Sequence, residues 1–517
     1  MCRPSKGLDG PARAAARAWL FRTFPPPRRA AKDPGMGGAA GADGVLERVR
    51  ARVAERFPAD LERIRSYLRL PSVSATGEGI RETAAATLDW VAGAGGAAEL
   101  VETGGHPLLV GELPGPAGAP RLLRYGMYDV QPAQEPEWTS PPFAAEVREL
   151  PGVGAAVVGR GSANSKGSLA AFFLAVEVLR ELDAMPVTVA LLVEGEEELG
   201  SPHLAAAAAA RRDDLAADAA FDLDLTAGLD GRPELILGCK GLLDLELTCE
   251  GGDWGGPAAD LHSSEQAWIA SPAWALVRAL GALSDAKEKP FPGLEGEPPG
   301  AGDEALLAEL AAGFDPAGHL REARAARYRL DDRDPAALLR ALLFSPTVNV
   351  SGIEAGYTGP GGKTIVPSRA RARVDVRLVP PVDPEAAAAA VRARLDARGL
   401  GHVAARVVDA YPWAKAAPGN RAARALRASY GALGLTPLPY PLAPWCAPYF
   451  VFDRVLGLEW ACGGAGHAAG AHGPDEYATV AGLRDHVVAA AAFLLAFARE
   501  PAAAPVGAAG HHQPDGA

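Results

Sequence analysis

The stretch VTVALLVEGEEELGS, residues 187–201, decides the fold because an apolar run in it ends in a cluster of acids. TVALLV is continuously apolar and rich in branched side chains, which predicts a buried strand. Four glutamates then follow within five residues, namely Glu194, Glu196, Glu197 and Glu198. Like charges this close repel, so one or more of them must be protonated, paired or bound to a cation. Two interpretations are open here, a solvated acidic loop and a metal site that carries a general base.

Two further apolar runs end in acids. RLLRYGMYD ends at Asp129, and AAFDLDL ends at Asp222 and Asp224. Helical spacing over 168–182 lies between such runs, and the alternation of strand and helix predicts an α/β layer with a largely parallel sheet flanked by helices. Ligands of such sheets bind at the carboxyl ends of the strands. Three acidic strand ends in one layer therefore favour a cation site over a solvated loop.

The length and the pattern predict more than one domain. A chain of 517 residues is too long for a single core. From about residue 240, runs such as LLDLELT alternate apolar and polar residues, as half-exposed strands do. We expect a catalytic domain in two parts, 43–239 and 404–500, interrupted by a smaller α+β domain over 240–403. The Arg-, Pro- and Ala-rich segment 1–42 and the tail 501–517 are predicted to be disordered extensions.

Local signals predict individual helices. Helical spacing covers 46–70 near the start of the first domain and 83–94 after it. In the inserted segment a helix is expected over 384–395, with Pro384 at its first position and Asp383 placed to cap it.

Composition excludes some classes of partner. The formal net charge of −12 argues against nucleic acid and anionic membranes, because both bind basic surfaces. No uninterrupted run of 18 apolar residues suggests a membrane span. The five cysteines are scattered, odd in number and without CxxC spacing, which predicts free thiols in a reducing, cytoplasmic environment.

Eight motifs together resemble the M20 metallopeptidase family, in particular its carnosine-dipeptidase-like branch. They stand in the family's order between residues 46 and 499: YGMYDVQP (125–132), EWTSPPF (137–143), GRGSANSKG (159–167), EGEEELGSPHL (194–204), DLHS (260–263), GYTGPGGKTIVP (356–367), RLVP (377–380) and AHGPDE (471–476). The resemblance implies a catalytic domain interrupted by a lid that forms a homodimer. It also implies hydrolysis with two zinc ions about 3.5 Å apart.

The resemblance assigns roles to the acids described above. Glu197 would be the general base. Asp129 would be the supporting acid that orients the family's first histidine ligand. The metal ligands would be Glu198, His472 and Asp224, with Asp222 as the less favoured alternative to Asp224.

Two positions depart from the family pattern. Met127 stands where the first histidine is expected, and Asn164 stands where the bridging aspartate is expected. A thioether suits Cu(I) and not zinc. Two dications about 3.5 Å apart repel by roughly 19 kcal/mol at an effective dielectric constant of about 20, so a neutral bridge disfavours a dizinc centre. The sequence predicts at most one divalent metal, Zn²⁺ or another, with Asn164 as a weak third ligand, and leaves open that none binds.

The substrate side of the resemblance involves the inserted segment. His262 in DLHS would reach across the dimer and polarise the scissile carbonyl. Arg377 would pair with the substrate carboxylate, for which a guanidinium is suited, and Asn349 and Thr364 would help form the same pocket. The family's REGGSIP is LAPWCAP here, which places Cys446 at the substrate-binding loop and predicts a different substrate terminus.

These observations predict a hydrolase acting on amide bonds of dipeptides or N-acyl amino acids. Two alternatives stay open. The chain could be a degenerate homologue that binds a ligand or serves as a structural partner without hydrolysis. It could also be a repurposed acyl-transfer or acid–base enzyme that uses the same pocket.

Overall fold

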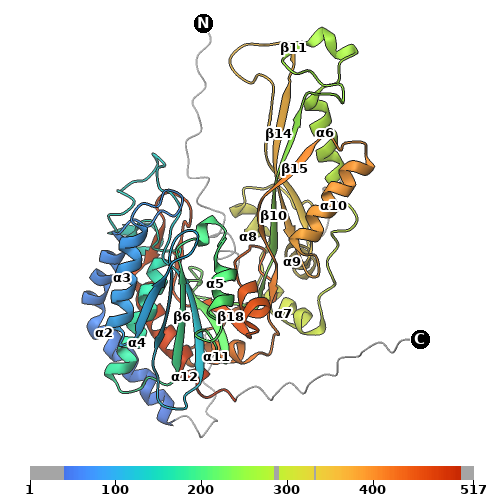
Figure 1. Ribbon diagram of the computed structural model, residues 1–517. Helices are drawn as coiled ribbons and strands as arrows, with labels where there is room; N and C mark the ends of the chain where they lie inside the picture. Colours follow the sequence, from blue (N-terminus) through green and yellow to red (C-terminus); the bar gives the residue numbers. More distant parts are fainter. Residues whose placement is uncertain (1–39, 285–289, 331–332, 502–517) are drawn as a thin grey trace.

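The computed structural model describes residues 40–284, 290–330 and 333–501 (Figure 1). The predicted extensions 1–42 and 501–517 lie almost wholly outside these ranges. Helix α2 (Ala40–Leu68) nevertheless begins inside the first of them, a few residues before the predicted helix.

A large sheet forms the centre of the larger part of the molecule. Its strand order is β1-β2-β6-β3-β7-β18-β8-β17. The pairings β6–β3, β3–β7 and β7–β18 are parallel, whereas β1–β2, β2–β6 and β18–β8 are antiparallel. The predicted α/β layer is confirmed, but the sheet is mixed and is parallel mainly in its centre. The strand bounds are β1 Ala97–Val101, β2 Leu108–Leu113, β6 Thr188–Glu194, β3 Arg121–Met127, β7 Ala219–Leu223, β18 Trp460–Gly464, β8 Glu234–Ile236 and β17 Leu438–Tyr440.

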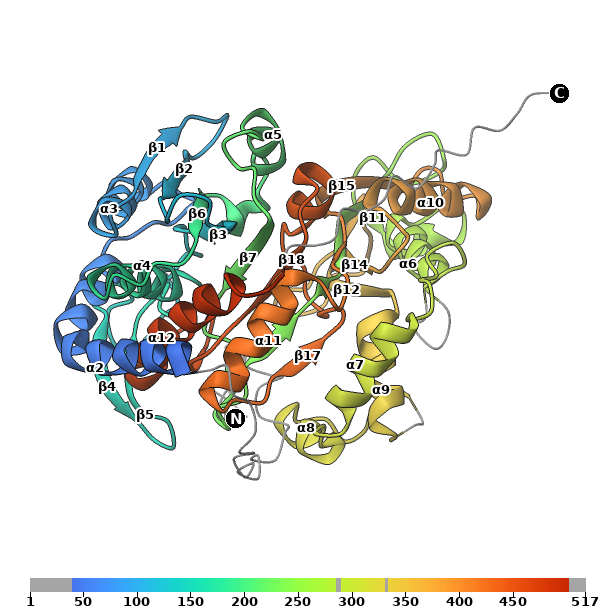
Figure 2. The same cartoon turned by 90° about the horizontal axis from the view of Figure 1, so that it is seen from below.

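Helices cover both faces of this sheet (Figures 1 and 2). Neighbouring residues of one strand belong to different cores, because Leu122 packs in one apolar cluster and Leu123 in another. One cluster lies under α2, α3 (Ile80–Gly93), α4 (Lys166–Glu181) and α12 (Val480–Phe497). Burial on both faces explains why the central strands are continuously apolar.

Helix α12 is long and apolar enough to cross a membrane by length and composition. It packs against α2, α4 and α11 (Arg421–Leu433), and 72% of it is buried inside the protein. Its apolar character is therefore that of a core helix.

A second sheet, with the order β12-β14-β10-β15, forms the lid (Figure 1). All three pairings are antiparallel, and α6 (Pro272–Leu283) and α10 (Pro384–Ala397) pack on it. The alternating burial along β10 matches the half-exposed strands expected from the sequence. The bounds are β12 Thr347–Ala355, β14 Arg369–Leu378, β10 Gly241–Glu250 and β15 Ala404–Tyr411, so the lid sheet extends past residue 403.

Some local features differ from the expectations. Asp383 is the N-cap residue of α10, but its side chain makes no capping hydrogen bond and instead accepts one from Arg454 Nη1 at 2.7 Å. Three helices of the inserted segment were not predicted, and the first of them packs against β17 of the large sheet. They are α7 Ala301–Ala311, α8 Pro316–Glu322 and α9 Pro335–Phe344.

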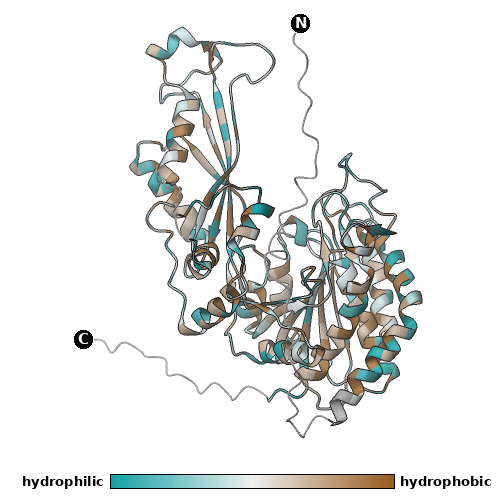
Figure 3. Cartoon of the chain, turned by 180° about the vertical axis from the view of Figure 1, so that it is seen from behind, coloured by the Kyte–Doolittle hydropathy of each residue, from teal (hydrophilic) through white to brown (hydrophobic). Residues whose placement is uncertain are grey.

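Figure 3 shows hydrophilic residues on the outer sides of the helices, in keeping with the apolar clusters between the helices and the large sheet.

Strand β6 ends in a buried acid. Glu194 is 2% exposed, and its Oε1 accepts hydrogen bonds from the hydroxyls of Tyr125 at 2.6 Å and Ser201 at 2.9 Å. Burial raises the pKa of Glu194 to about 8, and the hydrogen bond from Tyr125 only partly opposes this effect. The folded protein therefore keeps this carboxyl protonated at pH values where the unfolded chain has ionised it.

We expect stability to fall as pH rises from about 5 to 8, by up to about 1.4 kcal/mol per pH unit from this residue, because the folded state binds a proton that the unfolded state has lost. Glu194→Gln should make the free energy of unfolding less dependent on pH. Urea unfolding at several pH values measures the slopes. Glu47→Gln, at an exposed glutamate of α2, is the control. Equal slopes for Glu194→Gln and wild type would contradict the expectation.

Candidate functional site

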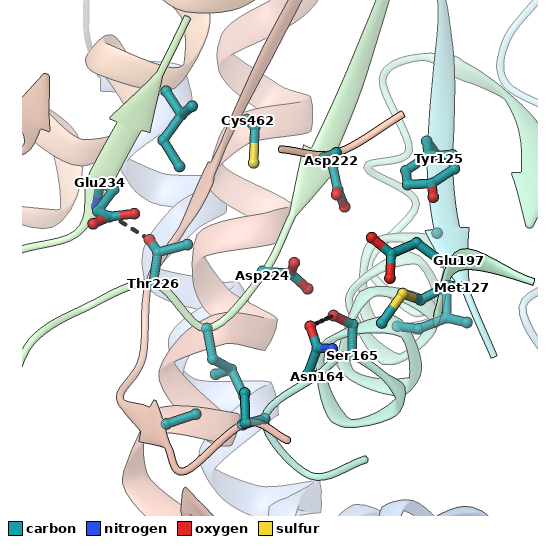
Figure 4. Close-up of a pocket in the computed structure, with 18 of the residues that line it drawn as sticks. Tyr125, Met127, Asn164, Ser165, Glu197, Asp222, Asp224, Thr226, Glu234 and Cys462 are labelled. Atoms are coloured by element: carbon teal, nitrogen blue, oxygen red, sulfur yellow. Dashed lines mark hydrogen bonds between the residues drawn. The ribbon is translucent and has the colours of Figure 1, made fainter. Parts of the chain in front are cut away.

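Three acidic strand ends lie side by side. Strand β3 runs between β6 and β7, so the acids after these strands gather at one edge of the sheet. The chain leaves β6 through a short 3-10 turn, η1 (Glu197–Leu199), which carries two of the glutamates. Figure 4 shows the pocket at this edge, with Glu197 and Asp224 facing one another across it.

Asp129 supports this turn from behind. It is fully buried, and its two carboxylate oxygens accept the backbone N–H groups of Glu197 at 3.2 Å and Glu198 at 3.0 Å. Burial, followed by the charge of Glu198, raises the pKa of Asp129 to about 7. The resemblance implied an acid that orients a histidine ligand. In the structure Asp129 fixes the backbone of the two glutamates.

Glu198, Asn164 and His472 converge on one point. Asn164 Nδ2 lies 2.6 Å from Glu198 Oε1 and 3.1 Å from His472 Nε2, and the last two atoms are 3.2 Å apart. The Glu198 side chain is 4% exposed, whereas that of His472 is 45% exposed. Gln131 Nε2 donates to Glu198 Oε2 at 2.8 Å and so holds the carboxylate in place.

A buried glutamate holds the loop that presents Asn164. Glu476 is 0% exposed, and its Oε1 accepts the backbone N–H groups of Ala163 at 2.8 Å and Asn164 at 2.9 Å. Its Oε2 accepts from Arg160 Nη1 at 2.7 Å, in an ion pair buried on both sides. Sequence reasoning gave Glu476 no role, although it ends the AHGPDE motif that contains His472.

Met127 and Asp224 also line the pocket, Met127 on the side of Glu197 and Asp224 across from it (Figure 4). Ser168 Oγ donates to Asp224 Oδ1 at 2.6 Å, so this carboxylate has a protein partner. Met127, 5% exposed, places a thioether beside Glu197. These two residues offer one hard anionic ligand and one soft neutral group.

Arg124 also lines the pocket, and sequence reasoning missed it. Its Nη1 donates to Asp222 Oδ1 at 2.5 Å, and Tyr449 donates its hydroxyl to Asp222 Oδ2 at 2.7 Å. The sequence did contain a signal for this residue, namely a charged side chain within the apolar run RLLRYGM. Both carboxylate oxygens of Asp222 therefore accept hydrogen bonds from side chains of the protein.

The group of Glu198, Asn164 and His472 differs from the pair of Met127 and Asp224 in how it fits a metal ion. Ligand atoms about 2.1 Å from a tetrahedral zinc lie about 3.4 Å apart. The 3.2 Å between Glu198 Oε1 and His472 Nε2 is close to that spacing, and Asn164 could add Oδ1 if its amide turned over. This group fits one divalent cation. Met127 and Asp224 do not fit a second one, and no cluster of three His, Cys, Asp or Glu ligands occurs within the described ranges.

Two of the predicted substrate-binding residues meet at the rim of the pocket. Arg377 Nη1 lies 3.2 Å from Cys446 Sγ, and the neighbours of Cys446 on both sides line the pocket. Lys240 is buried nearby and donates to the carbonyl oxygen of Ser345 at 2.6 Å. Burial, followed by the charge of Arg377, lowers the pKa of Lys240 to about 7. The guanidinium of Arg377 at this place favours an anionic group of a ligand.

The remaining substrate-side residues are not brought to the pocket of the same chain. His262 is exposed on β11 (Leu261–His262), which pairs with β13 (Ile365–Val366) at the far end of the lid (Figure 1). Thr364 is beside it, because its carbonyl accepts the N–H of Ser263 at 3.0 Å. Asn349 lies on β12 and donates to Asp375 at 2.7 Å.

Residues 124–500 match the sequence profile of the protein family described as peptidase family M20/M25/M40. The chain belongs to this family. An M20 family metallo-carboxypeptidase from Sulfolobus solfataricus is similar in structure, with a TM-score of 0.77 and 30% identity over 85% of this chain and 99% of the other. Human carnosine dipeptidase 1, at 20% identity and a TM-score of 0.71, shares the fold over 88% of this chain and 99% of its own.

Two relatives are similar in sequence over shorter segments. The Beta-Ala-His dipeptidase of Rattus norvegicus is 27% identical over 64% of this chain and 67% of its own length. The Cys-Gly metallodipeptidase of Saccharomyces cerevisiae is 28% identical over 54% of this chain and 57% of its own length. The comparisons support a hydrolase of the dipeptidase type.

Replacement of Glu476 tests how the site is held. Glu476→Gln leaves the buried guanidinium of Arg160 without its anion, and we expect a loss of about 3 to 5 kcal/mol in the free energy of unfolding. Chemical denaturation measures it. The control is Glu309→Gln, which breaks an exposed pair with Arg427 and should change stability by less than about 1 kcal/mol. Similar effects of the two substitutions would contradict a supporting role for Glu476.

Proposed function

We propose that the chain hydrolyses amide bonds of dipeptides or N-acyl amino acids with one divalent metal ion. The observation that carries this proposal is the convergence of Glu198, His472 and Asn164 beside Glu197. These three side chains would hold the ion, with Gln131 orienting Glu198. When bound, the ion supplies Lewis-acid polarisation at the scissile bond.

Glu197 suits the proton transfers. It lines the pocket opposite Asp224, and Asp129 fixes its backbone N–H. Its carboxylate takes a proton from the attacking water and returns it to the leaving amine, as a general base and then a general acid. Arg377 at the rim would pair with the substrate carboxylate, in keeping with the names of the dipeptidase relatives. Cys446, in contact with Arg377, would limit which carboxyl ends fit.

A second candidate is a homologue that binds a ligand without hydrolysing it. The hydrogen bonds of Asn164 to Glu198 and His472 favour it, because the three side chains satisfy one another without a cation. The acyl-transfer or acid–base alternative has no observation of its own beyond the retained Glu197.

Metal content and turnover separate these candidates. We expect at most one zinc per chain by elemental analysis, removed by a chelator together with dipeptide hydrolysis. Glu198→Gln should lose the metal, because it removes the anionic ligand. Glu197→Gln should keep the metal and lower kcat by about 10²- to 10⁴-fold, and Glu47→Gln should change neither. Two zinc ions per wild-type chain would contradict the interpretation that a neutral Asn164 at the bridging position disfavours a dizinc centre. A metal-free chain without turnover would favour the second candidate.

We further propose that the chain forms a homodimer through the lid. The distance along the lid between His262 and the pocket of its own chain supports this proposal (Figure 1). His262 of the partner subunit would then stabilise the oxyanion of the opposite site. Placement in the cytoplasm is also a proposal, and Cys239, Cys249, Cys446 and Cys462 are free thiols.

Mixed subunits test this arrangement. Chains with Glu197→Gln and chains with His262→Ala should each be nearly inactive, because each site lacks one group. Co-expression of the two should restore part of the activity, since a mixed dimer contains one site with both groups. Dimers that form in light-scattering measurements but recover no activity would refute the shared site.

A further inference from the structure

Arg124 is a fixed cation among the carboxylates of the pocket. Its side chain is 1% exposed and makes hydrogen bonds to Asp222 Oδ1 at 2.5 Å and to the carbonyl oxygen of Leu223 at 3.0 Å. The rings of Phe172 and Phe221 lie 5.4 and 5.7 Å from its guanidinium carbon. Two hydrogen bonds and two rings leave the guanidinium little freedom to move.

The charge of Arg124 lies near Asp224, which together with Met127 does not fit a metal ion. Asp222 near the end of β7 and Asp224 just after it both line the pocket (Figure 4), as does Arg124. Residues two apart on an extended segment leave the same face. The guanidinium reaches Asp222 and the carbonyl oxygen of Leu223 from the neighbouring strand β3, so its charge lies beside the residue that precedes Asp224.

The positive charge of a guanidinium is more permanent than that of a bound metal ion or a buried lysine. It stays protonated in proteins, whereas a buried lysine loses its proton readily. Lys240 in the same molecule shows that contrast, because burial lowers its pKa to about 7. Arg124 is therefore a permanent charge that neither a chelator nor a change of pH removes.

We infer that Arg124 takes the place of one metal cation, compensating the Asp222 and Asp224 carboxylates and excluding a second metal ion from the pocket. The inference rests on the proposed function only in that Glu198 and His472 hold the other cation. Arg124 is a positioning residue, since it touches Asp222 and not the reacting atoms.

Zinc stoichiometry tests the inference in a background where the missing ligands are supplied. Met127→His with Asn164→Asp provides a histidine and an anionic bridge. With Arg124 in place, we expect this double variant to bind one zinc per chain after dialysis. Adding Arg124→Leu and Asp222→Asn should raise the zinc content to two per chain, because the competing cation is gone. Both members of the ion pair are replaced so that neither is left as an unpaired buried charge, and the amide oxygen of the new asparagine still accepts the hydrogen bond from Tyr449. Two zinc ions in the double variant would overturn the inference, as would one zinc in a folded fourfold variant.

Folding is checked by circular dichroism and thermal unfolding. Should the fourfold variant not fold, Arg124→Gln in the double background takes its place, since glutamine is neutral and still donates to Asp222. It should also bind two zinc ions, and one would overturn the inference. The matched control is Arg421→Gln in the same background, because Arg421 is 6% exposed and lies 4.3 Å from the ring of Phe497, outside the pocket. It should leave one zinc.

The two proposals fail in different ways. A wild-type chain without metal or hydrolysis contradicts the proposed function. The inference about Arg124 is read from zinc content alone, in variants whose ligands have been restored, and it fails only if Arg124 does not limit that content.

Discussion

Mutual repulsion of carboxylates is the constraint on which this site depends. Acids follow three adjacent strands of the large sheet, and each needs a different compensation. Asp129 accepts two backbone N–H groups, Glu194 keeps a proton between two hydroxyls, and Asp222 pairs with Arg124. Glu198 contacts Asn164 and His472, two side chains that also suit a cation. The arrangement therefore directs any metal to one side of the pocket.

The sequence predicted the parts of this design that depend on local pattern. Apolar runs located β3, β6 and β7, and the acids at their ends located the pocket. The mixed order of the sheet and the three helices over 301–344 were not predicted, because strand pairing and packing on β17 are set by contacts between distant segments. Two strands alike in composition can pair in either direction.

The candidate site was predictable to the extent that motifs carry it. Glu197, Glu198, Asn164 and His472 come from three separated motifs; Glu197 and Asn164 line one pocket, and Glu198 and His472 contact Asn164. Their supports were not predictable. Glu476 holds the Asn164 loop from more than 300 residues along the chain, which no spacing rule indicates. Arg124 was visible as a charge in a buried strand, but no spacing rule pairs it with Asp222, 98 residues further along the chain.

The substitutions in this centre are consistent as a set of charges. Relative to the dizinc centre that the family resemblance implies, Asn164 removes one negative charge from the bridge, and Met127 replaces one neutral ligand with another. A guanidinium in place of one zinc ion lowers the cationic charge by one. The guanidinium is itself paired with Asp222, so what remains is the loss of one bridging anion together with one divalent cation. Buried charges must be compensated, and a site that holds fewer cations needs fewer anions, which gives a physical reason for a neutral Asn164 beside a single metal ion.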